Sequence, residues 1–124
     1  MSQKTILYVE DNEFNRKIIR QLLAQTSYRL REAHDGESGV RAAQDELPDL
    51  ILMDVQLPKM SGLEATQRLR ADPRTAAVPI IIVTSYAMDG DAQKAKDAGA
   101  TAYLAKPYSP RDLLAKIRDI VPEA

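Results

Sequence analysis

Residues 50–53 are Leu-Ile-Leu-Met, four consecutive apolar side chains that end directly at Asp54. Continuous rather than alternating apolarity is typical of a strand covered on both faces, as in a parallel sheet between two layers of helix. Three further runs have the same character: residues 6–9, 80–83 and 102–105. A fifth run, residues 28–33, alternates, which favours an edge strand with one face partly in water. The sequence therefore predicts five strands.

Segments with helical spacing lie between these runs, and each has an apolar stripe that can cover a sheet. The clearest stripes are Phe14, Ile18, Ile19, Leu22 and Leu23, and then Leu113, Leu114, Ile117, Ile120 and Val121. Weaker helices are predicted around Val40, Ala43 and Leu47 and around Leu63 and Leu69. The last stripe is small and shallow, and consists of Ala92, Ala95 and Ala98. We expect that helix to be the least firmly anchored.

Turn-forming residues mark the boundaries of these segments: Pro48, Pro58, Gly62, Pro79, Gly90, Gly99 and Pro110. Ser109-Pro110 also has the pattern of an N-cap followed by proline at the first helical position. Strict alternation predicts an α/β fold with a right-handed, doubly wound, five-stranded parallel sheet. At this size the flavodoxin-like (βα)5 arrangement, strand order 2-1-3-4-5, is the more economical of the two common orders. Strands 1 and 3 are then neighbours, and ligands bind beyond their carboxyl ends.

The composition is that of an ordinary folded domain. The chain has 124 residues, 44% of them hydrophobic, so we expect one domain over residues 1–124 and no output domain. Its 17 basic and 18 acidic side chains give a formal charge of -1, too weak a field to recruit nucleic acid or an anionic membrane. Apolar runs are far shorter than the roughly 20 residues of a membrane span. We expect a cytoplasmic protein whose partners bind through a local site.

Polar side chains follow each central strand of the predicted sheet. Glu10 and Asp11 come after the first strand and Asp54 after the third. Thr84 and Ser85 follow the fourth strand, and a lysine at position 106 follows the fifth. Because the carboxyl ends of parallel strands share one edge of the sheet, we expect these side chains to meet there. Three carboxylates in one place repel one another unless a cation joins them or protons are taken up.

The residue types at this edge indicate a particular chemistry. Oxygen ligands without histidine or cysteine select Mg²⁺ or Mn²⁺ over zinc, and Mg²⁺ usually keeps positions for waters and a phosphate oxygen. A carboxylate such as Asp54 can attack phosphorus and form an aspartyl phosphate. Lys106 and the Thr84 hydroxyl can stabilise the charge on the phosphoryl oxygens. The pattern therefore favours phosphoryl transfer to Asp54.

Each of these residues also has an ordinary structural explanation. An Asp at the end of a strand is most often a turn former, and Asp11-Asn12 alone indicates the cap of a helix that begins near Glu13. His34 is the only histidine and is expected in a surface turn. Function is favoured because three carboxylates, a hydroxyl and an amine converge on adjacent strand ends, which capping does not explain.

Four segments form specific sequence motifs: residues 9–12 (Val-Glu-Asp-Asn), 52–58 (Leu-Met-Asp-Val-Gln-Leu-Pro) with Gly62, 83–85 (Val-Thr-Ser) and 105–107 (Ala-Lys-Pro). With them the chain resembles, over essentially its whole length, the receiver (CheY-like) domains of two-component response regulators. Residues 11–16 (Asp-Asn-Glu-Phe-Asn-Arg) and 54–58 (Asp-Val-Gln-Leu-Pro) are most similar to phosphorelay, hybrid-kinase and stand-alone DivK-like receivers. One departure is Glu10, where many members have Asp, a longer side chain that keeps the carboxylate.

The resemblance implies a role for each residue at the strand ends. Asp54 would be the phosphorylated residue. Mg²⁺ would be bound by Glu10, Asp11, Asp54 and the main-chain carbonyl of Gln56, and Lys106 would pair with the phosphate.

The resemblance also implies a switch. Thr84 would turn its hydroxyl toward the phosphate, and Tyr103 would follow it inward, although Tyr103 is equally explained as a core aromatic of the fifth strand. Gly62 and Pro107 would be structural, and the peptide before Pro107 is expected to be cis, as is usual in the family.

These expectations combine into a phosphorylation-dependent binding protein. A histidine kinase or histidine phosphotransfer protein would donate to Asp54. The face of the fourth helix, fifth strand and fifth helix would then change shape and bind an unknown downstream protein, or a second copy as a homodimer. Residues 89–98 are expected to be the mobile element because their anchoring is weak. The chain would promote its own phosphorylation and dephosphorylation without being an enzyme in the usual sense.

Three other functions compete with this one. A metal-dependent phosphatase with an aspartyl intermediate usually has a second Asp two residues after the nucleophile, and Gln56 stands there instead. A nucleotide-binding module is disfavoured because no glycine-rich phosphate loop follows any predicted strand. A degenerate receiver that only docks would bind Mg²⁺ without becoming phosphorylated, but here every chemical position is filled.

Overall fold

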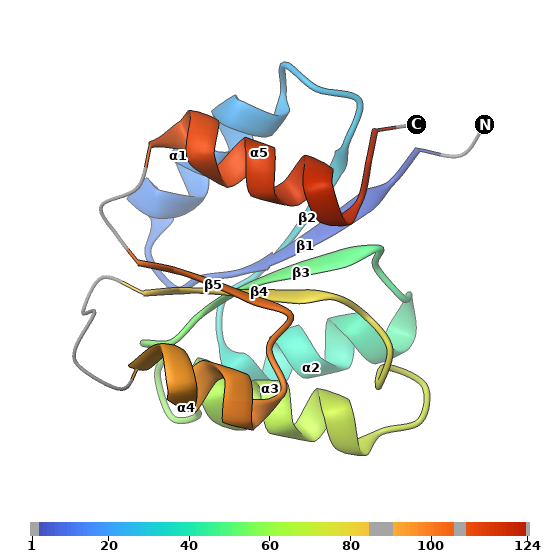
Figure 1. Ribbon diagram of the computed structural model, residues 1–124, viewed down its shortest axis with the longest axis vertical. Coiled ribbons are helices and arrows are strands. Elements are labelled where there is room, and N and C mark those ends of the chain that lie inside the picture. Colours follow the sequence, from blue (N-terminus) through green and yellow to red (C-terminus); the bar gives the residue numbers. More distant parts are fainter. Residues whose placement is uncertain (1–2, 85–90, 106–108, 124) are drawn as a thin grey trace.

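Strands and helices alternate strictly along the chain (Figure 1). The computed structural model describes residues 3–84, 91–105 and 109–123, apart from the side chains of residues 84 and 91. The elements in this part are β1 Thr5–Val9, α1 Glu13–Leu23, β2 Arg29–Ala33, α2 Gly36–Asp45, β3 Leu50–Asp54, α3 Gly62–Ala71, β4 Ile80–Thr84, α4 Asp91–Ala98, β5 Ala102–Ala105 and α5 Pro110–Ile120.

The strands form one parallel sheet in the order β2-β1-β3-β4-β5, which confirms the predicted fold and strand order. Helices α1 and α5 cover one face, and α2, α3 and α4 cover the other (Figure 1). The register pairs Val9 with Met53, and Asp54 with Val83. The ends of β1, β3 and β4 are therefore level, and the residues that follow them emerge at one rim of the sheet.

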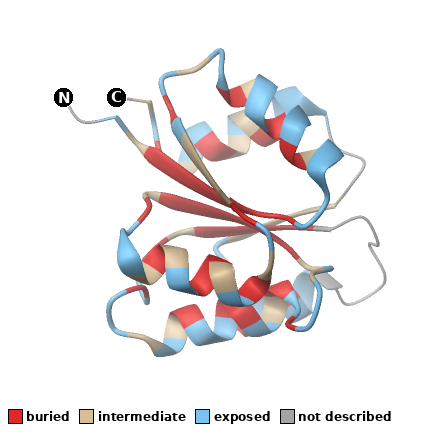
Figure 2. Ribbon diagram, turned by 180° about the vertical axis from the view of Figure 1, so that it is seen from behind, coloured by how far each residue is buried: buried red, intermediate tan, exposed pale blue. Residues whose placement is uncertain are grey.

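The central strands are buried throughout, which is why their sequences are continuously apolar (Figure 2). Successive side chains point to opposite faces, so the sheet separates two cores. One core contains Leu7, Val9, Ile51, Met53, Ile80 and Ile82 under α2 and α3. The other contains Ile6, Tyr8, Leu50, Leu52, Ile81 and Val83 under α1 and α5.

The apolar stripe predicted for the first helix, α1, is partly wrong. Ile19 and Leu23 of α1 are buried, but Phe14 is 70% exposed and Ile18 is 41% exposed. The position of α1 that faces the sheet one turn before Ile19 is occupied by Arg16, which is buried. The spacing predicted the helix correctly, but it could not tell that a charged side chain would replace an apolar one on the inner face.

Two smaller corrections concern the other helices. Helix α2 ends at Asp45, so Leu47 lies in the following loop and is 54% exposed. In α4, Ala95 and Ala98 are buried, whereas Ala92 is exposed. The apolar anchor of α4 is therefore smaller than the three-alanine stripe predicted.

Several helices begin at side chains that cap them, as the sequence indicates. Asn12 Oδ1 accepts the Asn15 N–H at the start of α1, at 3.0 Å. Ser109 caps α5, with Pro110 at its first position, as predicted. Such caps satisfy N–H groups that have no partner within the helix. Among the described residues, no helix has both the length and the apolar character that crossing a membrane would require.

Candidate functional site

Three carboxylates meet at the carboxyl ends of β1 and β3. Glu10 and Asp11 follow β1, and Asp54 is the last residue of β3. One oxygen from each lies within 4.8 Å of the others. Glu10 is 1% exposed and Asp54 is 5% exposed, whereas Asp11 faces solvent. This is the acidic cluster that the strand ends predicted, with two of its members removed from water.

Glu10 is held by donors from both of its flanking elements. The Tyr8 hydroxyl of β1 donates to Glu10 Oε1 at 3.1 Å, and the Asn15 side-chain amide of α1 donates to the same oxygen at 3.2 Å. The main-chain N–H of Asn12 donates to Oε2 at 3.3 Å. Burying a carboxylate is costly unless such hydrogen bonds compensate for the lost water. The three donors therefore make a buried Glu10 tolerable and also fix its direction.

Arg16 fixes the main chain of the same loop. Its Nη1 donates to the Glu10 carbonyl oxygen at 2.8 Å, and its Nε lies 3.3 Å from Glu32 Oε1 on β2. Its Nη2 also donates to Glu13, and this hydrogen bond is the main cause that lowers the pKa of Glu13. The buried guanidinium thus ties the β1–α1 loop to the neighbouring strand β2.

The turn after Asp54 brings the start of α3 against the end of β3. The Gly62 N–H donates to the Val55 carbonyl at 2.9 Å, and the Val55 N–H donates to Val83 on β4 at 3.2 Å. A Cβ on residue 62 would lie 2.0 Å from the Asp54 carbonyl oxygen, so only glycine fits. This close approach sets the backbone position of Asp54.

Comparison with known proteins gives the family of this arrangement. The family model for the response regulator receiver domain matches residues 6–118. The chain belongs to the response regulator receiver family. Receivers of this family are the signal-receiving domains of two-component systems. This confirms the resemblance predicted from the four sequence segments.

Individual relatives support the assignment over nearly the whole receiver. The polar-differentiation response regulator DivK of Brucella anthropi is 38% identical over 121 residues, which cover 98% of each chain. The receiver domain of the sensor histidine kinase PA1611 from Pseudomonas aeruginosa is 37% identical, with a TM-score of 0.88 over 96% of this chain and 98% of that one. That structure has a magnesium ion coordinated in its active-site cleft. The chemotaxis protein CheY4 of Vibrio cholerae is 28% identical, with a TM-score of 0.90 over 97% of this chain and 100% of that one.

The remaining predicted site residues of the receiver are only partly described. Thr84 is the last residue of β4 and pairs with Ala105 of β5, so its backbone reaches the same rim. Tyr103 is half-buried on β5 and packs against the core under α2 and α3. Gln56 is exposed in the turn after Asp54.

Ser85, Lys106 and Pro107 lie outside the described residues, as does the expected cis peptide. Their roles stay predictions, as does the role of the Thr84 hydroxyl.

Tyr8, Asn15 and Arg16 were not predicted to belong to the site. Tyr8 lies in an apolar run, and Asn15 and Arg16 lie in a helix, so each has an ordinary explanation by itself. The sequence did contain a sign of this proximity. Residues 8 and 10 point to the same side of an extended chain, and residues 15 and 16 lie about one helical turn after residue 12. The sequence could not show that their donors converge on Glu10.

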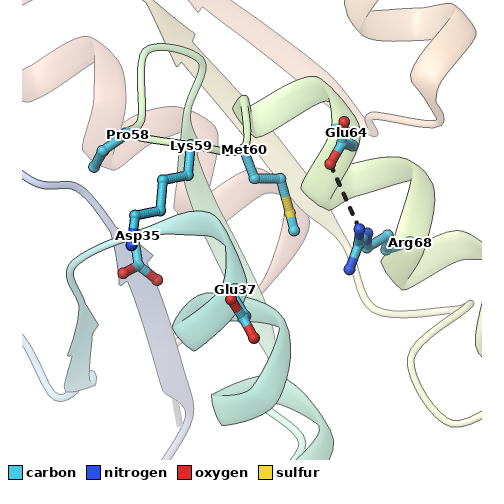
Figure 3. A pocket seen from close by; sticks show the side chains of 7 residues that line it. All are labelled: Asp35, Glu37, Pro58, Lys59, Met60, Glu64 and Arg68. Carbon is cyan, nitrogen blue, oxygen red and sulfur yellow. Dashed lines mark ion pairs between the residues drawn. The ribbon is translucent and has the colours of Figure 1, made fainter.

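A pocket of about 220 Å³ opens beside the turn that follows Asp54, between the starts of α2 and α3 (Figure 3). It is lined by charges of both signs, and Glu64 and Arg68 form an ion pair there at 3.7 Å. The adjacent helix ends are capped, since Asp35 accepts the Ser38 N–H and Ser61 accepts the Glu64 N–H. None of the three carboxylates of the acidic cluster lines this pocket, so the two are separate features.

The cluster fits a hard divalent cation. Its three members offer carboxylate oxygens and neither imidazole nor thiolate, which is the ligand set that Mg²⁺ prefers. Asp11 is exposed, so the cluster is open to solvent on one side and leaves room for waters. Such an ion would also relieve the repulsion among the three negative charges.

Proposed function

We propose that this receiver accepts a phosphoryl group on Asp54 from a phosphohistidine of a histidine kinase or histidine phosphotransfer protein. The observation that carries the proposal is the position of Asp54, which is buried at the end of β3 with Glu10 and Asp11 within 4.8 Å. A magnesium or manganese ion would be held by these three carboxylates and by the main-chain carbonyl of Gln56.

The transfer needs one nucleophile and one leaving group. An Asp54 carboxylate oxygen attacks phosphorus, and the P–N bond of the donor phosphohistidine breaks, with its electron pair returning to the imidazole. An ion held by the three carboxylates would supply positive charge that stabilises the phosphoryl oxygens. Lys106 and Thr84 would bind the other two oxygens. Burial of Asp54 lowers the local dielectric constant around its carboxylate, which strengthens these interactions.

The proposed output is a change in protein binding. The phosphorylated site would draw in the Thr84 hydroxyl and Tyr103, and the face of α4, β5 and α5 would present a new surface to a downstream protein or to a second copy of the chain. Residues 1–124 would act as one receiver domain in the cytoplasm. Phosphorylation and dephosphorylation would be reactions of the receiver on itself rather than turnover of a substrate.

Intact-mass spectrometry after incubation with acetyl phosphate tests the chemistry. We expect a gain of one phosphoryl group that requires Mg²⁺ and that Asp54→Asn lacks. Asp49→Asn is a matched control, because Asp49 lies just before the other end of the same strand and accepts the Thr5 N–H at 2.7 Å. Absence of both the adduct and a beryllofluoride complex in the unmodified protein would sink the phospho-acceptor proposal and favour a docking module.

A further inference from the structure

Two side-chain donors to Glu10 come from different elements and meet on one atom, Oε1. Tyr8 lies two residues before Glu10 on the extended chain, and Asn15 lies in the first turns of α1. Their hydroxyl and amide groups lie 3.1 Å and 3.2 Å from Oε1. An oxygen that accepts two side-chain donors from fixed elements is restricted in direction, because moving it breaks both hydrogen bonds.

This restriction matters because the residue is glutamate. Glutamate has one more rotatable bond than aspartate, so its carboxylate can occupy more positions relative to Asp11 and Asp54. A metal site built from a freely rotating carboxylate loses affinity, since the side chain must be ordered on binding. Tyr8 and Asn15 order it in advance.

We propose that Tyr8 and Asn15 are positioning residues that set both the affinity of the acidic cluster for Mg²⁺ and its preference for Mg²⁺ over Ca²⁺. The inference rests on the proposed function, because it assigns these residues to the same metal-dependent site. Neither residue belongs to the three carboxylates that could hold the cation. Both act through the Glu10 carboxylate.

Selectivity follows from the coordination chemistry of the two ions. Mg²⁺ requires nearly octahedral geometry with short bonds, whereas Ca²⁺ accepts longer bonds and irregular, flexible ligand sets. A Glu10 carboxylate held by the hydrogen bonds from Tyr8 and Asn15 favours Mg²⁺, the ion that needs defined geometry. When one of these hydrogen bonds is removed, the mobile carboxylate can still coordinate Ca²⁺, but it adopts the geometry that Mg²⁺ requires less often.

Tyr28 is a buried tyrosine without this positioning role and serves as the control for Tyr8. It is 4% exposed, close to the 1% of Tyr8, and packs in the same core under α1 and α5. Its hydroxyl donates to the Val121 carbonyl, which lies after α5, and Tyr28 itself stands before β2, at the rim opposite the acidic cluster. Removal of the Tyr28 hydroxyl is therefore the same chemical change in a similar environment, without a connection to Glu10.

The test measures binding of Mg²⁺ and Ca²⁺ by isothermal titration calorimetry, and thermal stability by scanning calorimetry. The variants are Tyr8→Phe, Asn15→Leu and the control Tyr28→Phe. We expect Tyr8→Phe and Asn15→Leu each to weaken Mg²⁺ binding by about 10-fold, the lower end of the range for groups that orient metal ligands, and Ca²⁺ binding by less. Tyr28→Phe should lower the melting temperature but leave both affinities unchanged. The double variant should lose less than the product of the single effects, because both donors act on one oxygen.

Unchanged Mg²⁺ binding in both single variants would overturn the inference, as would equal losses for the two cations or a matching loss in Tyr28→Phe. Asn15 is only half-buried, so Asn15→Leu keeps the test valid if Tyr8→Phe unfolds. If the unmodified protein binds Mg²⁺ and gains phosphate while the variants behave like it, the inference fails and the proposed function stands. If the unmodified protein binds no Mg²⁺, both fail together.

Discussion

Gly62 shows how a residue without a side chain can set the backbone position of Asp54 in the acidic cluster. A Cβ there would overlap the Asp54 carbonyl oxygen at 2.0 Å, and the Asp54 carbonyl carbon at 2.8 Å. Since both are main-chain atoms of β3, no side-chain rotation relieves the overlap. The end of the strand or the start of α3 has to move, and movement of the strand end displaces Asp54 from its neighbours.

We predict that Gly62→Ala destabilises the protein by about 3 kcal/mol, the upper part of the range for overpacking, and weakens Mg²⁺ binding as well. Urea unfolding and calorimetric titration measure the two effects. Gly36→Ala is the control, because its Cβ would meet the Met60 carbonyl oxygen at 3.0 Å, a milder contact. Equal stability of Gly62→Ala and the unmodified protein would show that the helix start adjusts without strain.

The members of the acidic cluster were predictable from sequence, because each of them ends or follows an apolar run and parallel strands share one rim. Their supporting donors were not. Tyr8 and Asn15 reach Glu10 through particular side-chain rotamers, and apolar periodicity carries no information about rotamers. For the same reason the pattern could not distinguish the buried Arg16 from the exposed Phe14, since both lie within one turn of the same helix.

The start of α2 illustrates how an element is fixed by its cap. Asp35 Oδ1 accepts both the Ser38 N–H and the Ser38 hydroxyl, each at 2.7 Å. These hydrogen bonds, with the Ser38 N–H as the larger cause, hold the pKa of Asp35 below its usual value. The folded protein thus favours the ionised form of this carboxyl more than the unfolded chain does.

This shift predicts how stability depends on pH. Because the folded pKa is depressed, the contribution of Asp35 is present above the unfolded pKa and is lost as pH falls through the folded pKa. Asp35→Asn keeps an oxygen that can cap the helix but does not titrate, so its stability should approach that of the unmodified protein from below as pH falls from about 4. Asp35→Ala should cost about 1 kcal/mol at neutral pH. Urea midpoints at several pH values measure this, and a constant difference between the Asn variant and the unmodified protein would contradict it.

Element boundaries were less predictable than element types. The run predicted for the second strand begins at Tyr28, but β2 begins at Arg29. The Tyr28 N–H donates to Thr26 Oγ1 at 3.2 Å, whereas the Arg29 N–H donates to the Lys4 carbonyl, just before β1, at 2.8 Å. Similarly, Leu47 was assigned to a helix that ends at Asp45. An apolar pattern does not show which main-chain hydrogen bonds form, and these bonds decide where an element begins or ends.

At the scale of the whole molecule, strict alternation was sufficient to predict the sheet. Right-handed crossovers leave few arrangements of five β-α units, and the switch between β1 and β3 places the site where it is found. The same topology connects the site to the opposite edge. Asp54 pairs with Val83, and Thr84 pairs with Ala105, so two steps of the ladder lead from the acidic cluster to β5, beside α4.

Helix α4 lies at the β5 end of this connection, and it is anchored by smaller buried side chains than α5. Its buried side chains, among those described, are Ala95 and Ala98, whereas α5 buries Leu113 and Ile117. A buried leucine or isoleucine contributes about 1.5–3 kcal/mol, well above what a single methyl group provides. Local opening of α4 should therefore require less free energy than opening of α5.

We predict that amide hydrogens in α4 exchange faster than those in α5, and that beryllofluoride with Mg²⁺ changes protection in α4 and β5 more than in α2. Hydrogen-exchange mass spectrometry measures this in the unmodified protein and in Asp54→Asn, which should show no response. Equal protection of α4 and α5 without the ligand would mean that small side chains do not weaken the helix. A response in α4 that persists in Asp54→Asn would mean that the change does not begin at the proposed phosphorylation site, Asp54, and does not pass from there through β4 to β5.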